Sequence, residues 1–150
     1  MNEPVHVEHL RVLWADTDAG GRIHWSAVFR WAEAAEHAFL RTLGWRPAEA
    51  GSYPRRSTEA AYHRPLRFGQ DFELRISVER VRTGSVTFGW TATSDGQVCV
   101  SGSHTVVHID ADGRPAPWPD RLRAGLADGG RAAGDRPGRT RPAGRPVSPS

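Results

Sequence analysis

What most constrains the fold is one long amphipathic helix in a chain whose other regular segments alternate like strands. From Ala27 to Leu43, apolar side chains recur at steps of three and four residues, which predicts one buried helix face. That face comprises Val28, Trp31, Ala32, Ala35, Phe39 and Thr42. At ~1.5 Å per residue the helix is about 25 Å long, enough to cross a sheet. Ser26 is expected as its N-cap, and Gly44 as the residue that ends it.

The segments around this helix show the two-residue alternation of half-buried strands. One strand is expected before the helix and four after it, at 5–14, 58–68, 72–79, 85–93 and 98–110. Asp95-Gly96, between the last two, is typical of a tight hairpin turn. One helix and about five antiparallel strands indicate an α+β domain. Because the helix needs apolar cover, we expect a curved sheet that wraps around it.

The 150 residues suit one domain, expected over residues 1–127 and closed by a short helix at 120–127. Residues 128–150 are rich in Arg, Pro and Gly and contain no apolar residue larger than Val. Such a segment cannot offset the entropy cost of ordering, so we predict a disordered tail. The tail has five Arg and two Asp, whereas the rest has 15 Arg and 15 acidic residues. The folded part therefore lacks the basic character of a nucleic-acid-binding domain.

Several classes of site are excluded by residue type or spacing. Cys99 is the only cysteine, so an intrachain disulfide and a cysteine-based zinc site are impossible. His104 and His108 share a strand face about 13 Å apart, too far for one metal ion. The chain has no lysine and hence no lysine-bearing phosphate loop, and no apolar run is long enough to span a membrane. We expect a soluble, cytoplasmic protein without metal or cofactor.

The stretch WADTDAGGRIHW, residues 14–25, combines two acids, two glycines and a histidine just before the helix. Gly20 and Gly21 let the backbone approach a bound group and adopt positive φ. The free N–H groups and positive dipole end of the helix can stabilise a carbonyl oxygen that gains negative charge. Asp16 or Asp18 can attack the carbonyl carbon, activate a water, or simply shape the turn. The parts needed for acyl transfer are therefore adjacent in sequence.

Residues 16–44 resemble the signature of the hotdog-fold thioesterases of the 4-hydroxybenzoyl-CoA thioesterase family, and most closely the branch of the Tol-Pal-associated acyl-CoA thioesterase. The matching residues are Trp14, Asp16, Asp18, Gly21 and Glu33. Weaker similarity continues at 62–74 and 102–119, in the family's order, so the resemblance covers roughly residues 10–127. It implies a helix wrapped by an antiparallel sheet, a thioester substrate on CoA or a carrier protein, and a homodimer or homotetramer with active sites between subunits.

The resemblance also implies roles for individual residues. Asp18 matches the catalytic aspartate, which acts as nucleophile or general base. Gly21 and the N–H of Trp25 match positions that polarise the thioester carbonyl. Structural roles near the site fall to Asp16, Gly20 and Glu33. Arg82 lies where some members contact the nucleotide end of CoA.

The chain departs from the family after the glycines, where Arg22-Ile23-His24-Trp25 replaces a more apolar sequence, and at Val28, where tyrosine is common. These positions line the acyl pocket or the oxyanion region in the family. Arg22, His24 and Val28 are therefore expected to bind substrate, and an aromatic or polyketide-like acyl chain fits the tryptophans. Arg64 and Arg67 either contact phosphate or are solvated strand residues.

Two other functions stay open. In a hotdog hydratase or dehydratase, His24 and Asp18 would act as acid and base on the β-position of the acyl chain, although their spacing differs from that class. A non-hydrolytic module would instead bind, or help to cyclise, chains held on a carrier protein.

Overall fold

A computed structural model of the chain describes residues 2–46 and 52–131. The elements in chain order are β1 (His6–Arg11), the 3₁₀ helix η1 (Trp14–Asp16), α1 (Ala27–Thr42), β2 (Arg55–Tyr62), β3 (Asp71–Val81), β4 (Ser85–Ser94), β5 (Gln97–Val107) and α2 (Asp120–Arg131). None of the helices in these described ranges is both long enough and apolar enough to cross a membrane.

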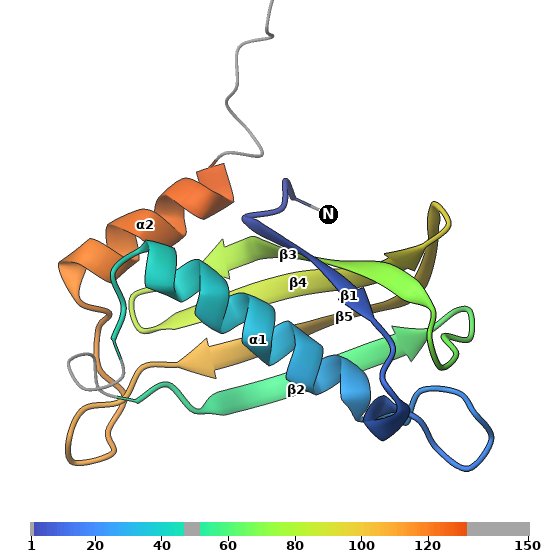
Figure 1. Cartoon of the computed structure of the whole chain (residues 1–150). Helices are drawn as coiled ribbons and strands as arrows, with labels where there is room; N and C mark the ends of the chain where they lie inside the picture. The colour runs from blue at the N-terminus through green and yellow to red at the C-terminus, as the bar shows by residue number, and fades with distance from the viewer. Residues whose placement is uncertain (1, 47–51, 132–150) are drawn as a thin grey trace, which may run out of the picture.

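The five strands form one antiparallel sheet in the order β1-β3-β4-β5-β2. The sheet curves around α1, which lies across one of its faces, and α2 packs beside the C-terminal end of α1 (Figure 1). The expected α+β architecture of one long helix wrapped by about five antiparallel strands is therefore confirmed. β1 and β2 form the two edges, because each has a sheet partner on one side only.

The core lies between α1 and the inner face of the sheet. The strands contribute Leu74, Ile76, Val78, Phe88 and Trp90, and α1 contributes Val28, Trp31, Ala32, Ala35 and Phe39. The ring of Trp31 lies 4.5 Å from that of Phe72, centroid to centroid. The predicted helix face is confirmed except for Thr42, which is exposed, while Glu36 is fully buried.

The sequence predicted the C-terminal end of α1 more accurately than the capping of its N-terminal end. Gly44 has a φ of 81°, and the N–H groups of Gly44 and Trp45 bond to the carbonyls of Arg41 and Leu40 at 2.9 and 3.1 Å. This Schellman arrangement confirms the predicted C-terminal end. At the other end, Ser26 occupies the N-cap position, but its side chain makes no capping hydrogen bond.

β2 is shifted relative to the predicted strand at 58–68, since it begins at Arg55 and ends at Tyr62. The strand stops because His63 and Arg64 both donate their N–H groups to the carbonyl of Cys99, at 2.8 and 3.1 Å, and Pro65 has no N–H to continue the ladder. The chain therefore leaves the sheet edge early and passes next to the turn before α1.

The C-terminal helix is longer than predicted. α2 extends to Arg131, so the first residues of the expected tail, 128–131, are helical. Leu122 and Leu126 are buried, and a Cβ on Gly129 would lie 3.0 Å from Val5 Cγ1. The small glycine thus permits close packing where the composition suggested disorder. Residues 132–150, which include the rest of the predicted tail, lie outside the described residues.

Candidate active site

Asp16 anchors the turn that precedes α1. It is 3% exposed, and its Oδ2 accepts the N–H of Leu13 at 2.9 Å. Its Oδ1 accepts a hydrogen bond from Arg30 of α1 at 2.9 Å, and its carbonyl accepts the N–H of His24 at 2.7 Å. Asp16 therefore ties both arms of the turn to the helix.

Asp18 lies at the tip of this turn with an exposed side chain. Its N–H donates to the carbonyl of Arg22 at 2.7 Å, and its Oδ1 accepts the N–H of Gly20 at 2.8 Å. Gly21 has a φ of 75°, which favours glycine. A Cβ on Gly20 would lie 3.2 Å from Asp18 Oδ1. The two glycines therefore hold the Asp18 carboxylate beside the backbone and open to solvent.

Two backbone positions, Gly21 and Trp25, were expected to polarise a carbonyl. Only one of their N–H groups lacks a hydrogen-bond partner in the described chain. The N–H of Gly21 donates to the carbonyl of Asp18 at 3.1 Å, within the turn. The N–H of Trp25, just before α1, donates to no group of the described chain. The hydroxyl of Tyr62 donates to the carbonyl of Trp25, which fastens the start of α1 to the end of β2. Partial burial raises the pKa of Tyr62, so this hydroxyl stays protonated.

His24 is held at the start of α1. Its Nδ1 lies 2.7 Å from Ser26 Oγ and accepts the N–H of Ser26 at 3.2 Å. This explains why the Ser26 hydroxyl does not cap the helix. The hydrogen bonds of the described residues do not join His24 to Asp18, so an acid–base pair of these two side chains is not formed within the chain.

Aromatic rings lead from the surface near the turn into the core. Trp25 is 63% exposed, and its ring meets that of Phe29 at 6.2 Å in an edge-to-face contact. Phe29 meets buried Trp90 at 6.1 Å in the same manner. On the other arm, exposed Trp14 lies 5.5 Å from Phe68. The turn is therefore flanked by aromatic surface suited to an aromatic or bulky apolar group.

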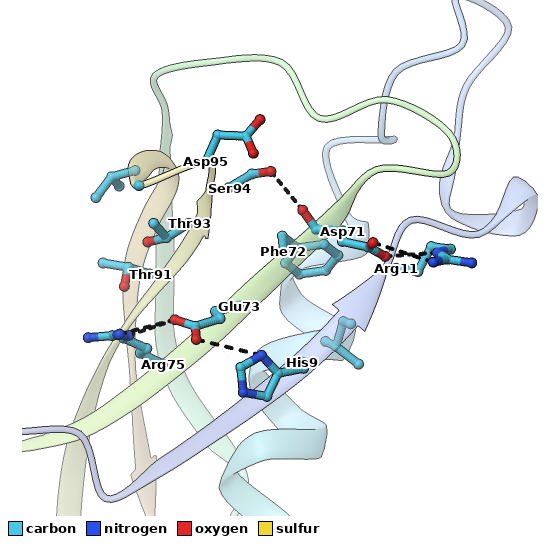
Figure 2. A pocket seen from close by; sticks show the side chains of 13 residues that line it. His9, Arg11, Asp71, Phe72, Glu73, Arg75, Thr91, Thr93, Ser94 and Asp95 are labelled. Carbon is cyan, nitrogen blue, oxygen red and sulfur yellow. Dashed lines mark hydrogen bonds and ion pairs between the residues drawn. The ribbon is translucent and has the colours of Figure 1, made fainter.

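A wide hollow lies elsewhere, at the end of the sheet formed by β1, β3 and the β4–β5 turn, with a volume of about 1180 Å³. Figure 2 shows that its arginines are paired with acidic side chains. Arg11 bonds to Asp71 at 2.8 Å, and Glu73 contacts Arg75 at 3.1 Å and His9 at 3.6 Å. None of its lining residues belongs to the turn at 16–25, so the hollow is not part of the candidate site.

Residues 12–126 match the thioesterase-like superfamily. The chain belongs to this superfamily. No curated protein matches the chain. Among solved structures, a protein of Prochlorococcus marinus assigned as a thioesterase is 22% identical with a TM-score of 0.77, and the match covers 87% of this chain and 100% of that chain.

Two further solved structures have names that specify their substrates. A gentisyl-coenzyme A thioesterase is 26% identical with a TM-score of 0.72, over 80% of this chain and 98% of that one. A 1,4-dihydroxy-2-naphthoyl-CoA thioesterase from Synechocystis is 14% identical with a TM-score of 0.76, over 82% and 96%. The fold of the chain is therefore the hotdog fold of the thioesterase-like superfamily.

This member of the superfamily also has a buried polar network that the sequence analysis missed. Glu36 is fully buried, and its Oε2 lies 3.0 Å from both His104 Nε2 and Arg55 Nη1. Trp90 donates its Nε1–H to His104 Nδ1 at 3.2 Å, so Nε2 carries the proton donated to Glu36. Burial alone would raise the pKa of Glu36, but His104 and Arg55 outweigh it and hold that pKa below its usual value.

The helix glutamate indicated by the resemblance is not the buried one. Glu33 is exposed and contacts Arg55 at 3.4 Å, at the rim of the network. Glu36 lies four residues after Ala32 and three before Phe39, so the helical periodicity already placed it on the buried face. Its charge alone kept it out of the predicted core.

Two residues expected to bind substrate lie away from the turn surface. Val28 is fully buried in the core, because it sits on the inner face of α1, and it is not open to a substrate in one chain. Arg82 follows the end of β3 and lines a hollow of about 410 Å³ beside α2. The turn lies near the other end of that strand, roughly 35 Å away at ~3.3 Å per residue, since Val12 bonds to Gln70.

Proposed function

We propose that this chain hydrolyses acyl-CoA or acyl-carrier-protein thioesters and that Asp18 is its catalytic carboxylate. Membership of the thioesterase-like superfamily supports a thioester hydrolase. One observation carries the assignment of the site. The short segment before α1 holds both an exposed carboxylate, on Asp18, and a backbone N–H without a partner in the described chain, on Trp25.

The segment can supply the two groups that thioester hydrolysis requires. The Trp25 N–H and the positive end of the helix dipole would stabilise the carbonyl oxygen as it gains negative charge. Asp18 would either attack the carbonyl carbon, giving an acyl-aspartyl anhydride and a thiolate, or take a proton from an attacking water. In both routes, thioester and water give a carboxylic acid and a thiol.

Replacement of Asp18 tests this mechanism. Asp18→Asn keeps the shape of the side chain and its bond to Gly20 but removes the charge, so we expect turnover to fall by about 100-fold or more. Asp112→Asn, at an exposed loop aspartate, is the control and should keep wild-type turnover. A fully active Asp18→Asn protein would falsify the mechanism. Single turnovers in ¹⁸O-water then distinguish the routes, because label in the Asp18 carboxylate requires direct attack.

The acyl group is proposed to be aromatic or polyketide-like. Trp25 and Phe29 offer aromatic surface at the start of α1, beside Arg22 and His24. The names of two structural neighbours specify gentisyl and 1,4-dihydroxy-2-naphthoyl groups. Hydrolysis rates on matched aromatic and aliphatic acyl-CoA substrates test this preference, and equal rates would contradict it.

We also propose that two or four copies of the chain assemble, with active sites between subunits. Asp18, Trp25 and Trp14 are exposed in one chain, and the edge strand β2 ends beside the turn. Arg82 lies far from the turn of its own chain, so its expected contact with CoA would have to reach a second copy. Light scattering after gel filtration tests the assembly, and a monomer that is fully active would contradict it.

A non-hydrolytic binding module is the alternative that one observation favours, because the exposure of Asp18 in one chain fits it as well. Such a module would bind an acyl thioester without turnover, and Asp18→Asn would leave that binding intact. A hydratase has less support, because His24 bonds to Ser26 and not to Asp18. Turnover of a crotonyl thioester to the hydrated product would favour it.

A further inference from the structure

A small pocket lies beside the turn that carries Asp18, with a volume of about 300 Å³. Its walls include Arg22, Ile23, Tyr62, His63, Arg64 and Leu66, and we call it the basic pocket. We infer that the basic pocket binds the phosphate groups of CoA when CoA carries the acyl group. The inference rests on the proposed thioesterase function and names the part of the chain that recognises the carrier.

Positive charge in the basic pocket is not compensated by acidic residues. Its lining contains no Asp or Glu, and the guanidinium groups of Arg22 and Arg64 form no ion pair with the described residues. Arg67, whose backbone pairs with that of Arg22, likewise has no acidic partner in the described part. The hollow in Figure 2 differs, because its arginines are bonded to Asp71 and Glu73. Unlike that hollow, the basic pocket therefore keeps its arginines available to an anion.

The basic pocket is built from the same backbone as the candidate active site. The N–H of Ile23 donates to the carbonyl of Leu66 at 2.9 Å, which joins the returning arm of the turn to the segment after β2. Tyr62 lines the pocket, and its hydroxyl bonds to the carbonyl of Trp25. The basic pocket and the Trp25 N–H therefore belong to one connected part of the chain, and the pantetheine arm of CoA would span the space between them.

The chemistry of the pocket favours CoA over a carrier protein. CoA carries a diphosphate and a 3′-phosphate, whereas a carrier-bound pantetheine has one phosphodiester. Guanidinium groups bind phosphate oxygens through paired, charge-assisted hydrogen bonds. Several arginines without acidic partners match the larger number of phosphate charges. In a folded part whose charges balance overall, this local excess also makes binding sensitive to salt.

Binding measurements separate the basic pocket from catalysis. CoA and pantetheine are the probes, because they share the thiol arm, while only CoA carries the phosphates together with the adenosine that they link. We expect Arg64→Gln to weaken CoA binding about tenfold and Arg22→Gln with Arg64→Gln about 100-fold, with far smaller effects on pantetheine. Arg80→Gln, an exposed arginine at the other end of β3, is the matched control and should leave both affinities unchanged. Calorimetry reports these affinities even if the protein hydrolyses no thioester.

Kinetics give a second test through the ratio of kcat/KM for an acyl-CoA to that for the matching acyl-pantetheine. The ratio should fall about tenfold in Arg64→Gln, through KM more than kcat. Equal CoA affinity in the double variant and the wild type would overturn the inference, as would an equal loss for CoA and pantetheine. Loss of CoA binding in Arg82→Gln together with unchanged binding in the double variant would also overturn it, because the phosphates would then contact Arg82 and not the basic pocket. A double variant that loses turnover only on acyl-carrier-protein substrates would overturn the inference as well.

Discussion

At the scale of single residues, the turn before α1 contains residues that fix the shape of the backbone and one residue, Asp18, that presents a charge to solvent. Asp16 is buried and fully bonded, whereas Asp18, two residues later, is exposed and bonded through one oxygen. The resemblance implied a structural role for Asp16, and the structure adds the hydrogen bonds by which Asp16 holds the turn. Gly21 adopts the positive φ that lets the chain reverse between Asp18 and Arg22.

Gly21→Ala should therefore affect both stability and turnover. A Cβ meets nothing within 4 Å, so the cost comes from the φ of 75° and should be about 1 kcal/mol. Gly113→Ala is a matched control, with a φ of 77° and equally open space in a distant turn. Thermal unfolding should show similar losses in both variants, whereas only Gly21→Ala should lose thioesterase turnover. Equal turnover in the two variants would show that the shape of the turn does not matter.

The lowered pKa of Glu36 leads us to expect a specific pH dependence of the free energy of unfolding. Its pKa is lowered in the folded state, so its stabilising contribution is complete well above the usual value of 4.5 and is lost as the pH falls through the lower folded pKa. Glu36→Gln should cost about 1–3 kcal/mol near neutral pH and flatten the acid limb of the stability curve. Exposed Glu33→Gln is the control and should keep the wild-type acid limb. Urea unfolding across the acid range measures both, and parallel curves for Glu36→Gln and the wild type would refute the role of the network.

At the scale of elements, the periodicity of apolar residues predicted the helix and strands whose bounds follow from one buried face. It missed the bounds that depend on tertiary contacts. The apolar steps of α1 and the alternation of β3 and β4 follow from one buried face, so the sequence located them closely. The bounds of β2 depend on a shared carbonyl at Cys99, a tertiary contact that no local pattern encodes. The same is true of the link from Tyr62 to Trp25, which brings the end of β2 to the site.

Tyr62→Phe tests that link. The variant removes the hydroxyl that donates to Trp25, so the start of α1 should be held less firmly against β2. We expect a loss of about 1 kcal/mol in stability and about tenfold in turnover. Tyr53→Phe removes a buried hydroxyl that has no hydrogen-bond partner among the described residues, so it should be neutral or slightly stabilising. Turnover in Tyr62→Phe that matches Tyr53→Phe would show that the link does not position the site.

At the scale of the whole molecule, composition separated a neutral folded part from an arginine-rich C-terminal segment, but it misplaced their boundary. Residues 128–131 have the glycine and arginine content of the tail and nevertheless continue α2. Composition could not reveal this, because the stabilisation comes from packing against Val5, just before β1, and against β3 and α1. Gly129 lies near Val5, Val78 and Phe39, three residues far apart in sequence.

Two truncated proteins test where the folded part ends and the C-terminal segment begins. Removing residues 132–150 should leave the melting temperature unchanged, as predicted for a tail that builds no core. Removing residues 128–150 also cuts the last turn of α2 and its packing on Val5 and Phe39, so it should cost about 1 kcal/mol and lower the melting temperature by about 4 °C. Calorimetry on the two proteins and the full chain measures the difference. Equal melting temperatures would place the boundary at residue 127, whereas a drop in both would assign a stabilising role to the final segment.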